Sequence, residues 1–137
     1  MLDRLSRWLR RPPPRALVML GIDYGCHQWH QALGAARDFR IRAFIDDEPW
    51  NHRTRIGETP VQYPGELVAL VRKHTACAVL QVEGAKTPPV DNWVLDELRT
   101  LKVPLLTLPA QLPESPSGYL AKLIERTPQD ACGDASQ

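Results

Sequence analysis

The stretch with the clearest chemical potential is a short turn after the first apolar run of the chain. It reads G-I-D-Y-G-C, from Gly21 to Cys26, and follows the apolar residues 16–20. In dinucleotide-binding domains, a turn at this place has the spacing G-x-G-x-x-G and holds a pyrophosphate at the N-terminus of the next helix. Here only the first glycine position is kept, because Asp23 and Cys26 stand at the other two.

The candidate phosphate-binding residues are those of the turn, namely Gly21, Ile22, Asp23, Gly25 and Cys26. The carboxylate of Asp23 would repel a phosphate by its like charge, whereas Gly25 could restore the turn if the loop shifts its register. The helix N-terminus offers free backbone N–H groups to an anion. Two interpretations stay open: a retained nucleotide site, and a site lost in favour of a structural or partner-binding role.

Two carboxylates follow the second predicted strand, which spans residues 39–45. Dinucleotide-binding folds place an acid about 20 residues beyond the glycine turn, where it binds the ribose hydroxyls. Asp46 fits that role, and equally fits a carboxylate that closes a turn at the strand end. Asp47 is expected to cap this turn.

A third predicted strand, residues 76–82, brings two more candidates to the same edge of the sheet. Gly84 completes the candidate cofactor-binding set, because ligands of α/β folds bind at the carboxyl ends of the strands. Lys86 is either a phosphate contact or a plain surface lysine.

Metal and nucleophilic chemistry have weaker support. Cys26 and His30 are four residues apart on one helix face, which is a spacing found in zinc sites, but two ligands on one helix do not make a site. Cys26 at a helix N-terminus would have a lowered pKa, but no catalytic partner can be assigned. We therefore predict no metal and no catalytic residue.

The elements that position these residues alternate between strands and helices, which indicates a parallel sheet with right-handed crossovers. We expect a three-layer α/β Rossmann-like domain of about four parallel strands in the order 3-2-1-4. Residues 56–61 are expected to form a turn and a short extended piece. The predicted strands are 16–20, 39–45, 76–82 and 103–108, and the predicted helices are 25–37, 64–74, 89–101 and 118–126.

The composition narrows the function classes. The chain has 137 residues, the usual size of one domain, and a net charge of +1, which argues against a dedicated nucleic-acid binder. Its three cysteines show no disulfide or zinc-ribbon spacing, so a reducing cytosol is the default. No apolar run reaches the roughly 18 residues of a membrane span. We predict a cytoplasmic protein.

The two ends of the chain differ in character from the middle. Residues 1–14 are expected to form a basic amphipathic segment and a proline linker, residues 15–126 the Rossmann-like domain, and residues 127–137 a polar tail. Met1–Arg11 combines Leu and Trp at helical spacing with arginines. It is either a docked terminal helix or an interfacial helix on anionic lipid.

Several short motifs resemble a known family. Gly21, the run Phe44-Ile45-Asp46-Asp47 with Pro49, and Ile56-Gly57 with Pro60-Val61 are similar to the N-terminal Rossmann-like domain of CapD/FlaA-like nucleotide-sugar dehydratases and epimerases of polysaccharide biosynthesis. The resemblance covers residues 15–108. In that family the domain follows membrane helices and precedes a catalytic domain, and neither is found in this sequence.

This resemblance implies a bacterial, stand-alone accessory or regulatory domain linked to polysaccharide or nucleotide-sugar metabolism. The implied ligands are NAD(P), coenzyme A or a nucleotide-sugar. A Tyr-x-x-x-Lys pair of the dehydrogenase type is absent, so catalysis is not expected. The alternative is a protein-interaction module or homodimer with a decayed nucleotide site, peripheral to the membrane through Met1–Arg11.

Overall fold

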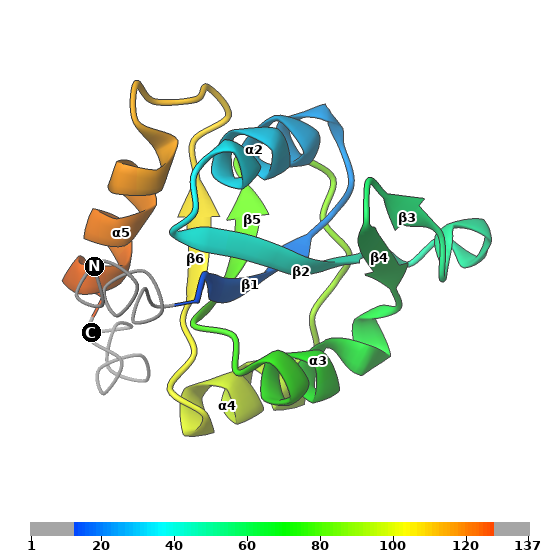
Figure 1. Cartoon of the computed structure of the whole chain (residues 1–137). Helices are drawn as coiled ribbons and strands as arrows, with labels where there is room; N and C mark the ends of the chain where they lie inside the picture. The colour runs from blue at the N-terminus through cyan, green and yellow to red at the C-terminus, as the bar shows by residue number, and fades with distance from the viewer. Residues whose placement is uncertain (1–12, 128–137) are drawn as a thin grey trace, which may run out of the picture.

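The computed structural model describes residues 13–127, which form a six-stranded sheet covered by helices on both faces (Figure 1). The strands and helices alternate along most of the chain, as the sequence predicts. In chain order the elements are β1 (Arg15–Leu20), α2 (Tyr24–Ala35), β2 (Phe39–Ile45), η1 (Pro49–Asn51), β3 (Arg55–Ile56), β4 (Thr59–Gln62), η2 (Pro64–Glu66), α3 (Leu67–His74), β5 (Ala78–Val82), α4 (Asn92–Thr100), β6 (Leu105–Leu108) and α5 (Pro116–Arg126).

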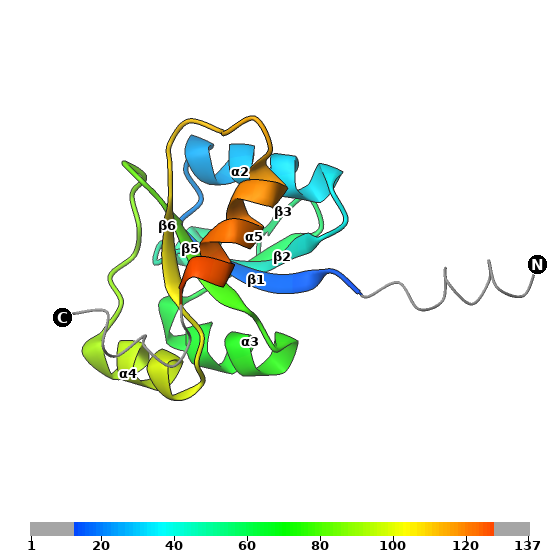
Figure 2. The same cartoon turned by 90° about the vertical axis from the view of Figure 1, so that its left-hand side faces the viewer.

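The sheet separates two helical layers, which confirms the three-layer α/β prediction. The strand order is β3-β4-β2-β1-β5-β6, and every pair is parallel except the β3–β4 hairpin. Helices α3 and α4 lie together on one face of the sheet, and α2 and α5 lie on the other (Figure 2).

The predicted strand order needs two corrections. The strand beside β2 is β4 and not the strand at residues 76–82, which pairs as β5 with the other side of β1. The strand at residues 103–108, expected beside β1, is β6 and pairs with β5. The missed strand falls in residues 56–61, where a turn and a short extended piece were expected. The sheet therefore has two more strands than predicted, both in the β3–β4 hairpin.

The core explains why β1 is a continuous apolar run. Leu17 and Met19 pack with α2 and α5, whereas Val18 and Leu20 pack with α3 and α4. All four side chains are buried, and each contributes roughly 1.5–3 kcal/mol relative to an exposed side chain. A strand buried on both faces cannot show hydrophobic alternation.

The predicted helices are confirmed with small shifts at their ends. On α4, Val94 and Leu98 are buried, whereas Trp93 is 55% exposed. Within residues 13–127, no helix is long and apolar enough to cross a membrane. The structure describes neither residues 1–12 nor residues 128–137. The predictions for Met1–Arg11 and for the polar tail therefore lie outside the described part of the chain.

Candidate functional site

The turn after β1 requires glycine at its first position. Gly21 has a φ of +96°, and a Cβ added there would lie 2.8 Å from the carbonyl oxygen of Lys86. Its N–H donates to the carbonyl of Ile45 at the end of β2, 2.8 Å away. Gly21 therefore holds three loops close together at the carboxyl edge of the sheet.

Gly25 lies inside the first turn of α2 and does not shift the register of the loop. A Cβ on Gly25 would lie 3.0 Å from Cγ1 of Val82 on β5. Close packing of helix against strand is the usual role of the third glycine of a dinucleotide turn. Gly25 takes over that role, one residue before the expected position.

Cys26 occupies the third glycine position as a small core side chain. It is fully buried, and its Sγ lies 3.7 Å from the carbonyl oxygen of Leu20. Burial raises the pKa of its thiol to about 11. The prediction that Cys26 has a lowered pKa at this helix N-terminus is therefore wrong.

Asp23 precedes α2 but does not cap it. Its side chain makes no cap hydrogen bond, and its Oδ2 instead accepts the backbone N–H of Lys86, 2.7 Å away. The carboxylate is turned toward the loop after β5. The side chain of the N-cap residue Asp23 therefore does not occupy the backbone N–H groups of the first turn of α2.

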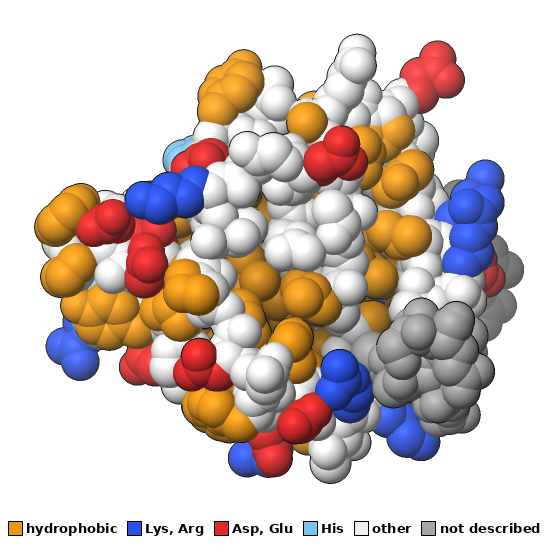
Figure 3. Space-filling model, turned by 180° about the vertical axis from the view of Figure 1, so that it is seen from behind, with side chains coloured by type: hydrophobic (Ala, Val, Ile, Leu, Met, Phe, Trp, Pro, Cys, Tyr) orange, Lys and Arg blue, Asp and Glu red, His pale blue; other side chains and the backbone are white. Residues whose placement is uncertain are grey.

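Lys86 joins the same loop to the one that follows β2. Its Nζ lies 3.5 Å from Oε1 of Glu48. The lysine side chain is 74% exposed, so this pair adds little stability. Figure 3 shows, at its left edge, a cationic side chain among several carboxylates.

Asp46, rather than Asp47, holds the turn after β2. Asp46 is buried, and its Oδ2 accepts hydrogen bonds from Nδ2 of Asn51 (2.8 Å) and the N–H of Glu48 (3.3 Å). Its Oδ1 accepts no hydrogen bond from residues 13–127. Asp47 is exposed.

Gly84 provides a positive-φ position in the loop after β5. It has a φ of +81°, and nothing lies within 4 Å of an added Cβ. Its conformation favours glycine, and its surroundings leave open space beside it.

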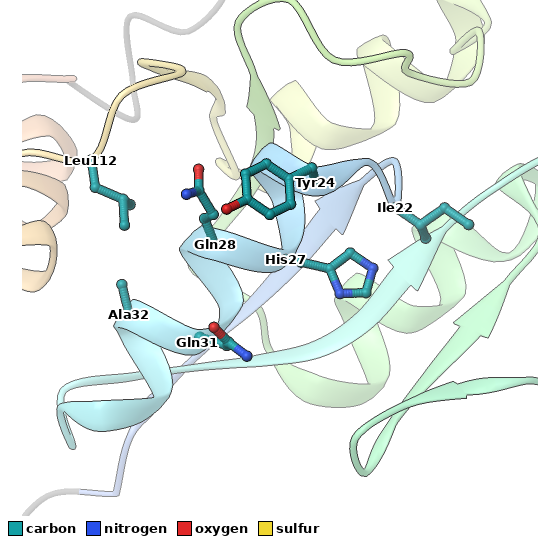
Figure 4. A pocket seen from close by; sticks show the side chains of 7 residues that line it. All are labelled: Ile22, Tyr24, His27, Gln28, Gln31, Ala32 and Leu112. Carbon is teal, nitrogen blue, oxygen red and sulfur yellow. The ribbon is translucent and has the colours of Figure 1, made fainter.

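An open groove of about 770 Å³ crosses the exposed side of α2 next to the turn (Figure 4). Figure 4 shows Tyr24 and Gln28 pointing from α2 toward the segment of Leu112, with His27 on the other side of the helix. The ring of His27 stacks at 6.3 Å on Phe44 of β2. The remaining lining residues are Ile22, Gln31 and Ala32.

Sequence reasoning missed three exposed aromatic residues that follow strands at this edge. Tyr24 is 77% exposed after β1, Trp50 is 73% exposed after β2, and Trp93 is 55% exposed after β5. Large exposed aromatic side chains are typical of binding surfaces. The signal available in the sequence for Tyr24 and Trp50 was their position just after predicted strands, whereas Trp93 lies within the predicted helix 89–101.

Cys26 and His30 do not converge on a common point. The thiol faces the carbonyl of Leu20, whereas Nε2 of His30 lies 3.1 Å from Oγ1 of Thr59. Burial, and then the charge of His27, lower the pKa of His30. In the described part of the chain, no three His, Cys, Asp or Glu side chains could share a metal ion.

Comparisons with known proteins identify the fold. No protein-family profile matches the chain, and no curated protein matches it in sequence. Among solved structures, the chain is similar to a UDP-D-quinovosamine 4-dehydrogenase from Vibrio fischeri, with 23% identity and a TM-score of 0.57. That alignment covers 80% of this chain and 86% of the other.

The chain is also similar to RSP, a Rex-family repressor, with 13% identity, a TM-score of 0.54 and 90% of this chain covered. It spans 64% of that repressor chain. The repressor was also solved with β-NADH, and with β-NAD⁺ and operator DNA. At these identities the likeness shows the Rossmann-like fold, and it supports neither the CapD/FlaA-like family specifically nor the exclusion of nucleic acid as a partner.

Proposed function

We propose that this chain is a non-catalytic accessory or regulatory domain that binds a nucleotide at the carboxyl edge of its sheet. The ligand class is a dinucleotide of the NAD type or a nucleotide-sugar. Its phosphates would lie at the first turn of α2, and a ribose would lie at the end of β2.

The observation that supports this proposal best is the state of the first turn of α2. Gly21 brings the chain tightly from β1 into the helix, and the side chain of the N-cap residue Asp23 makes no cap hydrogen bond to the N–H groups that follow. Such a helix end attracts an anion through its N–H groups and its dipole. The rotation of Asp23 toward Lys86 takes its carboxylate out of the N-cap hydrogen bonds.

The end of β2 supplies the second contact. Oδ1 of Asp46 accepts no hydrogen bond from residues 13–127, while Oδ2 accepts the two that hold the loop. A carboxylate held in this way can accept a hydrogen bond from a ribose hydroxyl without rearranging. Asp46 thereby combines the two roles that the sequence left open.

The neighbours support the choice of ligand and the link to sugar nucleotides. One solved neighbour is a dehydrogenase of a UDP-sugar, and another was solved with β-NADH. Burial raises the pKa of the Cys26 thiol to about 11, which argues against that thiol as a nucleophile; the non-catalytic role is our proposal. A cytoplasmic location remains our prediction.

The test is an amide NMR titration of the full chain with NAD⁺, NADH, NADP⁺, coenzyme A and UDP-N-acetylglucosamine in separate experiments. Saturable shifts at residues 21–27 and at Asp46 are expected for at least one of them. An Asp46→Asn variant keeps an acceptor for Asn51 and should weaken that ligand severalfold. If no ligand shifts these amides at millimolar concentration, the proposal is wrong.

A second candidate is a protein-interaction module whose nucleotide site has decayed. The exposure of Tyr24, Trp50 and Trp93 favours it, because aromatic side chains are enriched at interfaces. A Trp50→Ala and Trp93→Ala double variant distinguishes the two functions. If the chain is a protein-interaction module, the double variant would reduce self-association or partner capture. If it is a nucleotide-binding domain, the variant would leave the ligand-induced NMR shifts at residues 21–27 unchanged.

A further inference from the structure

The first half of β2 has a free edge. On one side, β1 pairs with β2 along its whole length, from Phe39 to Ile45. On the other side, β4 pairs only with Phe44 and Ile45. Within the described part of the chain, residues 39–42 therefore have no strand on their outer side. Such an edge can pair with another chain.

The backbone groups that face this free edge belong to Phe39 and Ile41. The N–H of Arg15 donates to the carbonyl of Asp38, so alternation along the strand turns residues 38 and 40 toward β1. Oγ1 of Thr59 donates a hydrogen bond to the carbonyl oxygen of Ile41, 3.3 Å away, which places that carbonyl on the outer side. No backbone group of residues 13–127 pairs with the outward N–H groups of Phe39 and Ile41.

A groove of about 1360 Å³ runs along the free edge. Four consecutive residues of β2, 39–42, line its floor, and Glu58, Thr59 and Pro60 close one end. The end of α2 forms one wall and the last turn of α3 forms the other. Figure 1 shows β2 in the foreground between these two helices.

The groove is lined by cations that have no carboxylate partner. None of them forms an ion pair with any residue of 13–127, and only two carboxylates, Asp38 and Glu58, face the same groove. Asp38 already accepts a hydrogen bond from Oγ of Ser117, 2.9 Å away. The five cations are Arg15, Arg37, Arg40, Arg42 and Lys73.

The pKa of His74 is consistent with several positive charges on the α3 side of the groove. Its pKa is lowered first by burial and then by the charges of Lys73 and Arg42. Arg40 is two residues before Arg42 on the same strand, and it is exposed. The positive charge therefore lies along the strand edge itself.

We propose that this groove binds an acidic peptide segment of a partner protein, which adds as an extended strand beside residues 39–42 of β2. A peptide backbone supplies acceptors for the N–H groups of Phe39 and Ile41 and a donor for the carbonyl of Phe39, whereas the carbonyl of Ile41 keeps its hydrogen bond from Thr59. Phosphates of a nucleic acid or a lipid offer acceptors alone. Strand addition uses main-chain hydrogen bonds for affinity and side chains for specificity, and here the arginines select carboxylates.

This site is independent of the proposed nucleotide site. It lies along the amino half of β2, whereas Asp46 follows the carboxyl end of the same strand. Loss of one binding activity therefore does not imply loss of the other.

The test uses the full chain and a fluorescein-labelled, end-blocked hexapeptide of alternating Thr and Glu. Saturable binding by fluorescence anisotropy is expected, with the amides of Phe39 and Ile41 shifting in NMR spectra. A peptide with Lys in place of Glu should bind at least about tenfold more weakly, because it meets five cations. Equal binding of the two peptides would overturn the proposal.

Two further comparisons separate strand addition from simple charge attraction. An Arg40→Gln and Arg42→Gln double variant should weaken the acidic peptide by roughly fivefold to tenfold. An Arg99→Gln and Lys122→Gln variant removes the same charge outside the groove and should leave binding unchanged. In an extended peptide, every second N–H faces β2 and the others face away. N-methylation of the set that faces β2 should abolish binding, and N-methylation of the set that faces away should preserve it.

The proposal is overturned if both methylated peptides bind as well as the parent. It is also overturned if the acidic peptide fails to bind while a single-stranded DNA 12-mer or phosphatidylserine vesicles bind through Arg40 and Arg42. Those results would make the groove a general polyanion surface.

Discussion

The backbone N–H of Lys86 donates a 2.7 Å hydrogen bond to Oδ2 of Asp23, and this bond joins the loops that leave the adjacent strands β1 and β5. The carbonyl of the same lysine faces Gly21, where even a Cβ would lie 2.8 Å from its oxygen. One residue of the β5 loop thus fixes both the start and the middle of the turn. An aspartate at the second glycine position has become a structural link.

We expect Asp23→Asn to tighten the binding of NADH about fivefold. The amide oxygen can still accept the N–H of Lys86, while the negative charge near the phosphates is removed, which relieves roughly 1 kcal/mol of repulsion. The measurement is the Kd from the NMR titration. Glu125→Gln on α5 makes the same charge change on an exposed helix face and should leave the Kd as it is. An unchanged Kd in Asp23→Asn would contradict the proposed phosphate position.

Gly21→Ala should destabilise the fold more than Gly84→Ala does. Both glycines have positive φ, so each alanine costs roughly 1–2 kcal/mol of backbone strain. Only Gly21 also faces a backbone oxygen, that of Lys86, whereas Gly84 has open space around it. We expect an additional loss of at least about 1 kcal/mol for Gly21→Ala in urea unfolding, because overpacking is destabilising. Equal losses for the two variants would show that the turn relaxes easily.

The parts of the fold that sequence reasoning predicted correctly are those with strong hydrophobic patterns. β1 is apolar from Ala16 to Leu20 because both faces are buried there, and this pattern is readable without a structure. β4 was missed because Thr59–Gln62 is short and contains Pro60. The proline is tolerated because only Val61 and Gln62 pair with β2.

The candidate site was predicted in outline and not in its contacts. The sequence brought Gly21, Asp46 and Lys86 to one edge, and the structure places their loops together. It could not show that Asp23 bonds to Lys86, because that contact joins residues 63 positions apart. It could also not show the exposure of Trp93, which lies in the first turn of α4, where its Nε1 donates to Oδ2 of Asp91.

The buried thiol of Cys26 predicts a loss of stability in alkaline solution. Its folded pKa is raised from 9.0 to about 11, so its contribution is fully present below pH 9 and falls as pH rises toward 11. The expected slope is about 1.4 kcal/mol per pH unit over this window. Urea unfolding at pH 8, 9 and 10 should show this slope relative to a Cys26→Ala variant, which keeps every other titrating group. Parallel pH profiles would mean that the thiol is solvated in the folded state.

The lowered pKa of His30 predicts a loss of stability in acidic solution. Burial and the nearby His27 lower its pKa from 6.5, and its Nε2 lies 3.1 Å from Oγ1 of Thr59 in the only hydrogen bond joining α2 to β4 among the side chains of residues 13–127. A depressed folded pKa gives stability that is present above pH 6.5 and is lost as pH falls through the folded value. The free energy of unfolding should therefore decrease between pH 7 and pH 5 more steeply in the natural protein than in His30→Gln. His74, whose pKa is also lowered, is present in both proteins and cancels in this comparison. If the two pH profiles coincide, His30 is as well solvated in the folded protein as in the unfolded chain.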